Sequence, residues 1–458
     1  MGLMPGQQSK RARPDNGVID ERGIAAGIPT STMATLMASV FTVSMGFGII
    51  LPLLPYLIER LLGPAGDVSQ VSRSTGLLTG LYMLSLFLFA PIWGHLSDRF
   101  GRRIVLHIGL IGFSATMVTF SIIENLYVVY VERFLSGMFA AAVTPVALAV
   151  IGDLATTESL RARRLTFVSI AGISGFLLGP MLGVSLSRWA ADVLPIANAA
   201  GSLAVPMVAT AILAIIVAAA VMLTVPATPS AGPAISKHEQ YRPATIRWLV
   251  PRLLSLSFIV SAGIGVFEVG LALRGKQDLG LSQYQIAVMF TECSLVMLVV
   301  QAVVFSPWIR PETTRWFIAP AFAILAAGLF LVPRASDFTL MLAVVGAVAA
   351  SAGVLSPILT YWISSKAGRA QGAELGKQTS AASLGAAIGS AAGGVLFDVA
   401  WLPNASFLLV TLLTATGVLL SLGLPKLLSV RITDAGDTNG AGDILKSASS
   451  TATGRPIA

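Results

Sequence analysis

The stretch Gly94-His95-Leu96-Ser97-Asp98-Arg99-Phe100-Gly101-Arg102-Arg103 is a short basic turn between two long apolar segments of this 458-residue chain. An apolar segment of about 20 residues can cross the roughly 30 Å core of a bilayer as a helix. Arginines beside the ends of such segments are typical of the cytoplasmic side. The stretch therefore predicts two membrane-spanning helices joined by a cytoplasmic turn.

The composition places most of the chain in lipid. Hydrophobic residues make up 55% of the sequence and charged residues 11%, against about a quarter charged in soluble domains. The net charge of +8 comes from basic residues dispersed at the ends of apolar segments, so we expect no nucleic-acid partner. With one cysteine and three histidines, we expect no disulfide, no metal and no cofactor.

Twelve apolar segments predict an all-α integral membrane protein with twelve transmembrane helices in two six-helix pseudo-repeats. The predicted spans lie near 34–58, 75–93, 104–123, 126–150, 165–187, 202–224, 248–272, 284–305, 316–333, 338–363, 376–397 and 405–425. The predicted domains are a disordered cytoplasmic tail (1–32), an N-terminal half (33–225), a cytoplasmic linker (226–247), a C-terminal half (248–425) and a second disordered tail (426–458).

The basic residues predict the orientation of these spans. With the N-terminus inside, the cytoplasmic segments, together with Arg252 and Lys377 at the cytoplasmic ends of their spans, hold 23 of the 30 Lys and Arg residues. The opposite side holds 6, and Arg133 lies deeper within a span. We therefore expect a multi-pass protein of the cell (inner or plasma) membrane with both termini in the cytoplasm.

Three glycines recur at one spacing in the fifth and eleventh predicted spans. They are Gly175, Gly179 and Gly183 in the first half, and Gly385, Gly389 and Gly393 in the second. A parallel duplication of this kind places a substrate path between the halves, near the midplane.

The basic turn resembles the signature loop between helices 2 and 3 of the major facilitator superfamily, and the resemblance covers roughly residues 33 to 425. It implies a gate, with the acid near the positive N-terminus of the eleventh span and the arginines bridging to carboxylates or lipid phosphates. A plain positive-inside turn is the alternative, but it needs neither the acid nor the glycines. The matching positions are Gly94, Leu96, Asp98, Arg99, Gly101, Arg102 and Arg103.

Arg133 and Gly137 in the fourth span resemble a second motif of the superfamily. The resemblance implies an Arg that faces the cavity, bonds to the first span and assists proton coupling; the alternative is a structural Arg. Neighbouring side chains leave a helix about 100° apart. We therefore expect a poor ion pair between Arg133 and Glu132, with Glu132 facing another helix or the cavity edge.

The fifth span carries Gly175, Gly179, Pro180 and Gly183, which resemble the motif associated with antiporters of the superfamily. A purely structural role in tight helix packing is the alternative, because small residues four apart let two helices approach closely. The first span is similar to that of twelve-span drug and proton antiporters. It departs from them at Met45, where many relatives carry an acid, so a proton must be carried elsewhere.

Three acids lie within predicted spans and are candidate proton carriers. In order of preference they are Glu292, Glu132 and Glu268, because Glu268 is expected near the outer boundary. Intramembrane acids are functional candidates, although a paired or solvated acid is the alternative for each. Arg133 is a candidate for tuning the carrier.

Aromatic and neutral polar residues are candidates for the substrate cavity, since such walls suit bulky amphipathic ligands. Lipid-facing or interfacial aromatics are the alternative. The candidates are Phe47, Tyr82, Phe176, Tyr361, Trp362 and Gln378.

Neither an ATP-binding loop nor a nucleophile-base cluster occurs, so we expect no enzyme. The favoured function is proton-coupled export of hydrophobic or amphipathic small molecules by a monomeric secondary transporter, an efflux antiporter of the multidrug-resistance kind. An uptake symporter, a facilitator and a dedicated metabolite exporter remain alternatives, as does a membrane sensor that binds without transport.

Overall fold

The computed structural model describes residues 29–63, 66–154, 158–193, 199–227, 244–304, 306, 309–366, 371–399, 402 and 404–428. These residues form helices and turns, with no strand among them. Nearly all of the predicted tails and most of the predicted linker lie outside the described residues.

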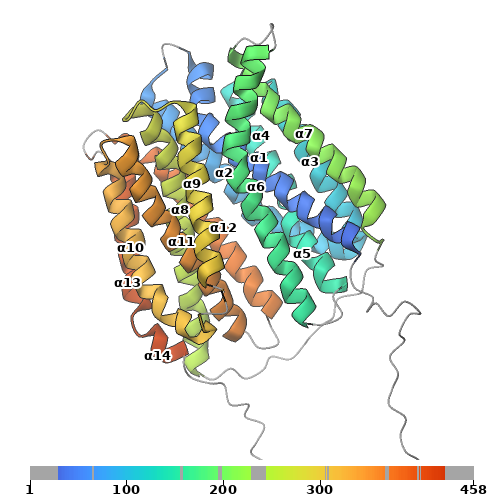
Figure 1. Ribbon diagram of the computed structural model, residues 1–458, viewed down its shortest axis with the longest axis vertical. Helices are drawn as coiled ribbons and strands as arrows, with labels where there is room; N and C mark the ends of the chain where they lie inside the picture. Colours follow the sequence, from blue (N-terminus) through green and yellow to red (C-terminus); the bar gives the residue numbers. More distant parts are fainter. Residues whose placement is uncertain are drawn as a thin grey trace, which may run out of the picture.

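Two sets of helices lie side by side, the first coloured blue to green and the second yellow to red (Figure 1). The first set is α1 (Thr30–Leu62), α2 (Val68–Phe100), α3 (Arg102–Ser121), α4 (Leu126–Ala140), α5 (Val143–Leu154), α6 (Glu158–Val193) and α7 (Ala199–Thr224). The second set is α8 (Ala244–Gln277), α9 (Gln283–Val304), η1 (Pro311–Phe317), α10 (Ile318–Leu331), η2 (Val332–Arg334), α11 (Phe338–Lys366), α12 (Gln371–Val395), α13 (Ala405–Ser421) and α14 (Leu424–Leu428).

Ten segments of the described chain are long and apolar enough to cross a membrane, with α4 and α5 forming one of them and η1, α10 and η2 another. Helix α13 is apolar but has only 17 residues. Helix α12 carries Glu374 and Lys377 near its start, and glycine, alanine and serine predominate in the rest. Such a helix is suited to packing against other helices more than to facing lipid. Together these elements are compatible with twelve spans.

Small residues explain which helices pack together. A Cβ added at Gly179 in α6 would lie 2.7 Å from the Met45 carbonyl oxygen in α1, so only glycine permits this approach. In the second half, a Cβ at Gly389 in α12 would overlap the Ala262 carbonyl oxygen in α8. The recurring glycines therefore make equivalent helix pairs, α1 with α6 and α8 with α12.

Each half has its own buried core. One cluster is drawn almost wholly from α1–α7 and includes Leu36 and Phe113. The other is drawn almost wholly from α8–α14 and includes Phe267 and Phe322. Two separate cores allow the halves to move as rigid bodies around whatever lies between them.

Candidate functional site

A cavity of about 360 Å³ lies between the two halves. Its wall comes from α1, α2, α4, α5 and α6 of the first half, and from α8, α9 and α11 of the second. Apolar side chains dominate this wall, with Ser44, Thr144 and Ser294 adding hydroxyl groups. The cavity is therefore large enough for a small organic molecule and has few groups that fix its orientation.

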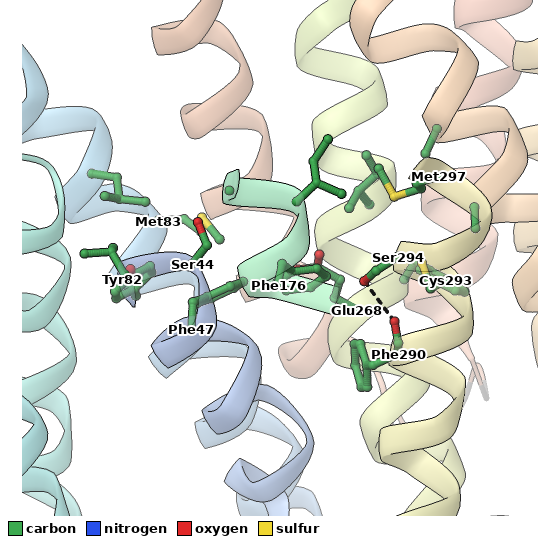
Figure 2. A pocket seen from close by; sticks show the side chains of 18 of the residues that line it. Ser44, Phe47, Tyr82, Met83, Phe176, Glu268, Phe290, Cys293, Ser294 and Met297 are labelled. Carbon is green, nitrogen blue, oxygen red and sulfur yellow. Dashed lines mark hydrogen bonds between the residues drawn. The ribbon is translucent and has the colours of Figure 1, made fainter. Parts of the chain in front are cut away.

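Three aromatic rings form one side of the cavity. Phe47 stacks on Tyr82, with centroids 5.1 Å apart and planes 16° apart, and on Phe176, at 5.8 Å and 23°. Figure 2 shows Phe47 between these two rings. All three residues are candidates from the sequence, and they come from three different helices, α1, α2 and α6.

Glu268 of α8 is the only charged residue among the described residues that line the cavity. Its side chain is half-buried, and within the described part of the chain no hydrogen bond or ion pair reaches its carboxylate. From the sequence, Glu268 is expected near the outer boundary of a span ending at 272. In the structure α8 continues to Gln277, and Glu268 lines the cavity.

One face of α9 completes the wall opposite the aromatic rings. Phe290, Cys293, Ser294 and Met297 all line the cavity (Figure 2). The Ser294 hydroxyl donates to the Phe290 carbonyl oxygen at 3.0 Å, as serines often do within a helix. None of these residues was predicted from the sequence, although their i, i+3, i+4, i+7 spacing is the signal of a shared helix face.

Glu132 and Arg133 form a buried ion pair behind the cavity wall. Arg133 donates from Nε and Nη2 to the two carboxylate oxygens of Glu132, both at 2.7 Å, and each residue is 2% exposed. The expectation of a poor pair is wrong. Both side chains are long enough to bend toward each other, and a buried charge without a partner is costly. Neither residue lines the cavity, so the expected cavity-facing arginine lies instead behind Tyr82.

The remaining acid and polar candidates lie away from the cavity. Glu292 is half-buried on another face of α9, where its Oε1 would lie 3.4 Å from a Cβ at Gly346 of α11. Tyr361 packs edge-on against Trp362, and the Trp362 indole donates to Thr314 at 3.2 Å. Gln378 donates to Thr360 at 2.7 Å. Tyr361, Trp362 and Gln378 are not among the residues that line the cavity.

The basic turn joins α2 to α3 at one end of the bundle, here called the motif end. Gly101 connects the helices with φ 96°, a conformation that favours glycine. Arg102 contacts two acids, Asp98 at 2.6 Å and Asp153 at 3.1 Å. Arg99 lies over the Phe100 ring, with its Cζ 5.4 Å from the centroid. The ion pairs of Arg102 therefore tie the turn to α5 within the first half.

The remaining positions of the turn have different surroundings. A Cβ added at Gly94 would meet open space, whereas the Nε of Arg103 is buried without a hydrogen-bond partner among the described residues.

The opposite end, here called the closed end, is where contacts join the two halves. The Tyr56 hydroxyl donates to the Leu281 carbonyl oxygen at 2.8 Å, and Lys276 forms an ion pair with Glu59. Nearby, a Cβ added at Gly76 of α2 would lie 2.5 Å from the Gly394 Cα of α12. Backbone contact of this kind brings α2 and α12 of the two halves together at this end.

These features define a multi-pass membrane protein with a ligand cavity between two repeated halves. A sequence profile of the Major Facilitator Superfamily matches residues 36–373, and the chain belongs to this family. It is thus a transporter of a generally non-enzymatic family whose members bind small-molecule substrates.

Two bacterial relatives match most of the chain. Multidrug resistance protein 1 of Bacillus subtilis (strain 168) is 26% identical over 399 residues, covering 85% of this chain and 95% of the relative. Quinolone resistance protein NorA of Staphylococcus aureus (strain COL) is 26% identical over 369 residues, covering 80% of this chain and 89% of the relative.

Solved structures share the fold. The D-xylose-proton symporter has a TM-score of 0.69 at 15% identity, covering 86% of this chain and 97% of that chain. The human organic anion transporter MFSD10 (TETRAN) has a TM-score of 0.63 at 20% identity, covering 86% of this chain and 100% of that chain.

Proposed function

We propose that the protein exports hydrophobic or amphipathic small molecules in exchange for protons. The observation that carries this proposal is the cavity between the halves, which has an aromatic wall and a single unpaired carboxylate, that of Glu268. Aromatic walls with few fixed hydrogen bonds accept cargo of varied shape. The names of the bacterial relatives, which are multidrug and quinolone resistance proteins, agree with this reading.

Glu268 is the proton carrier in this proposal. A carboxyl group can exchange a proton only where water or cargo reaches it, and Glu268 alone among the three acids lines the cavity. Glu132 has both oxygens bonded to Arg133, and Glu292 lies on another face of α9. We therefore place Glu268 ahead of Glu292 and Glu132 as the carrier.

The exchange of cargo for protons follows from competition between the two for the Glu268 carboxylate. The excess of basic residues supports a cytoplasmic location for the motif end, with both termini and the linker on that side. The closed end then faces outward, and the conformation is the one that binds cargo from inside the cell. Cargo binding releases the proton of Glu268 inward; after the halves rock, the departure of cargo lets Glu268 take a proton from outside.

Transport by purified protein in proteoliposomes tests this function. With ethidium as the cargo, a pH gradient should drive uphill movement of the dye by wild-type protein. Glu268→Gln should reduce that movement about 5- to 150-fold, the usual range of a lost coupling, while exchange of dye without a gradient continues. Glu292→Gln is the matched control, because it removes the same charge from a site outside the cavity.

Two results would oppose the proposal. Full gradient-driven movement in a well-incorporated Glu268→Gln variant would remove Glu268 as the carrier. Dye movement by wild-type protein that ignores the gradient would favour a facilitator.

A further inference from the structure

The buried pair of Glu132 and Arg133 lies outside the cavity that contains Glu268. The pair is fully enclosed, yet it touches the cavity wall through one ring. The Cζ of Arg133 lies 5.7 Å from the Tyr82 ring centroid and 4.6 Å from that of Phe120. The guanidinium thus contacts aromatic rings of α2 and α3 while Glu132 holds its edge with two hydrogen bonds.

Tyr82 connects this pair to the cavity. It is 3% exposed, it contacts Arg133, and it stacks on Phe47, which stacks in turn on Phe176. The backbone of Tyr82 is also held by α4, because a Cβ at Gly137 would lie 2.5 Å from the Tyr82 carbonyl oxygen. A continuous set of contacts therefore runs from the ion pair to the aromatic surface that cargo would meet.

We propose that Glu132 is a positioning residue for cargo specificity: by fixing the Arg133 guanidinium against Tyr82, it holds the aromatic wall flat and favours planar aromatic cargo. This inference rests on the proposed function, since it takes the cavity as the cargo site. A guanidinium held by two parallel hydrogen bonds keeps one plane. Rings that are already in place bind flat cargo without the cost of ordering them.

Two variants test the inference without leaving a buried charge unpaired. Arg133→Lys keeps the positive charge beside Glu132 but loses the planar group that lies against the rings. The double variant Glu132→Gln/Arg133→Met removes both charges together, a change that proteins often tolerate. Arg274→Lys is the matched control, because Arg274 also pairs with a carboxylate, that of Asp278 at 2.7 Å, and does not line the cavity.

The measurement is equilibrium binding of two cations to purified protein in detergent. Ethidium is planar and aromatic, whereas tetrabutylammonium carries the same charge without a ring. In both test variants we expect the ratio of affinities for ethidium and tetrabutylammonium to fall about five- to tenfold. A change of this size corresponds to the loss of one contact with an aromatic ring. Arg274→Lys should keep the wild-type preference, and melting temperatures should show that all variants are folded.

A purely structural pair would weaken both probes alike, so an unchanged preference in folded test variants would overturn the inference. An equal change in Arg274→Lys would also overturn it. The proposed function fails separately if wild-type protein prefers ethidium but a pH gradient does not drive its transport. Wild-type protein that binds neither probe would remove both proposals.

Discussion

Asp98 is the residue through which the basic turn can influence the transport cycle. Its carboxylate pairs with Arg102 at 2.6 Å and is 60% exposed at the motif end. We expect Asp98→Asn to slow transport about fivefold while the protein remains in the membrane. The reason is a lost bias of about 1 kcal/mol toward one state, the size of a charge beside a helix terminus.

The matched control for Asp98→Asn lies at the other end of the same helix. Asp67 caps the start of α2 by accepting from the Ser69 amide at 3.0 Å, and asparagine caps a helix equally well. Dye export should therefore be normal in Asp67→Asn. Wild-type export rates in Asp98→Asn at equal protein levels would show that this acid is not part of a gate.

Individual residues also show how much of the candidate site could be predicted from the sequence. The aromatic rings that the first half contributes to the cavity wall could be predicted, whereas Phe267 and Phe290 of the second half could not. The ion pair of Glu132 and Arg133 could not, since helix geometry alone ignores the bending of long side chains in a dry environment. The cavity position of Glu268 could not be predicted either, because apolar length does not show which face of a helix meets a cavity.

At the scale of elements, apolar length predicts that a span exists but not where its helix ends. Helix α8 runs past Arg274 and Lys276 because the fold satisfies both charges. Arg274 donates to the Ala335 carbonyl oxygen at 2.9 Å, and Lys276 donates to that of Pro55 at 3.1 Å. Such partners come from distant parts of the chain, so no local pattern reveals them.

Helix α12 offers a test of the close helix packing within one element. A Cβ at Gly389 would overlap the backbone of α8, whereas a Cβ at Gly376 meets nothing within 4 Å. We expect Gly389→Ala to destabilise the protein by about 1–3 kcal/mol, as overpacking usually does, and to lower its melting temperature in detergent.

Gly376→Ala is the matched control for that packing test. It places the same methyl group on the same helix and should leave the melting temperature unchanged. Equal melting temperatures for the two variants would contradict the close contact between α8 and α12.

For the molecule as a whole, the distribution of basic residues predicts the orientation in the membrane. Val68 and Phe100 mark the two ends of α2 and are each 57% exposed. In a Cys293→Ala background, which removes the one cysteine of the chain, an impermeant maleimide added to intact cells should label Val68→Cys and not Phe100→Cys. The opposite pattern of labelling would invert the topology and turn the proposed exporter into an importer.

The proposed transport cycle depends on competition between cargo and a proton for Glu268 in the cavity. Release of protons on cargo binding measures it most directly, with ethidium added to purified protein in weakly buffered detergent and a pH indicator. We predict that wild-type protein and the Glu292→Gln control release protons in proportion to bound dye. Glu268→Gln should bind dye without releasing protons. Dye binding by wild-type protein with no proton release at any pH, or release that persists in Glu268→Gln, would contradict the account.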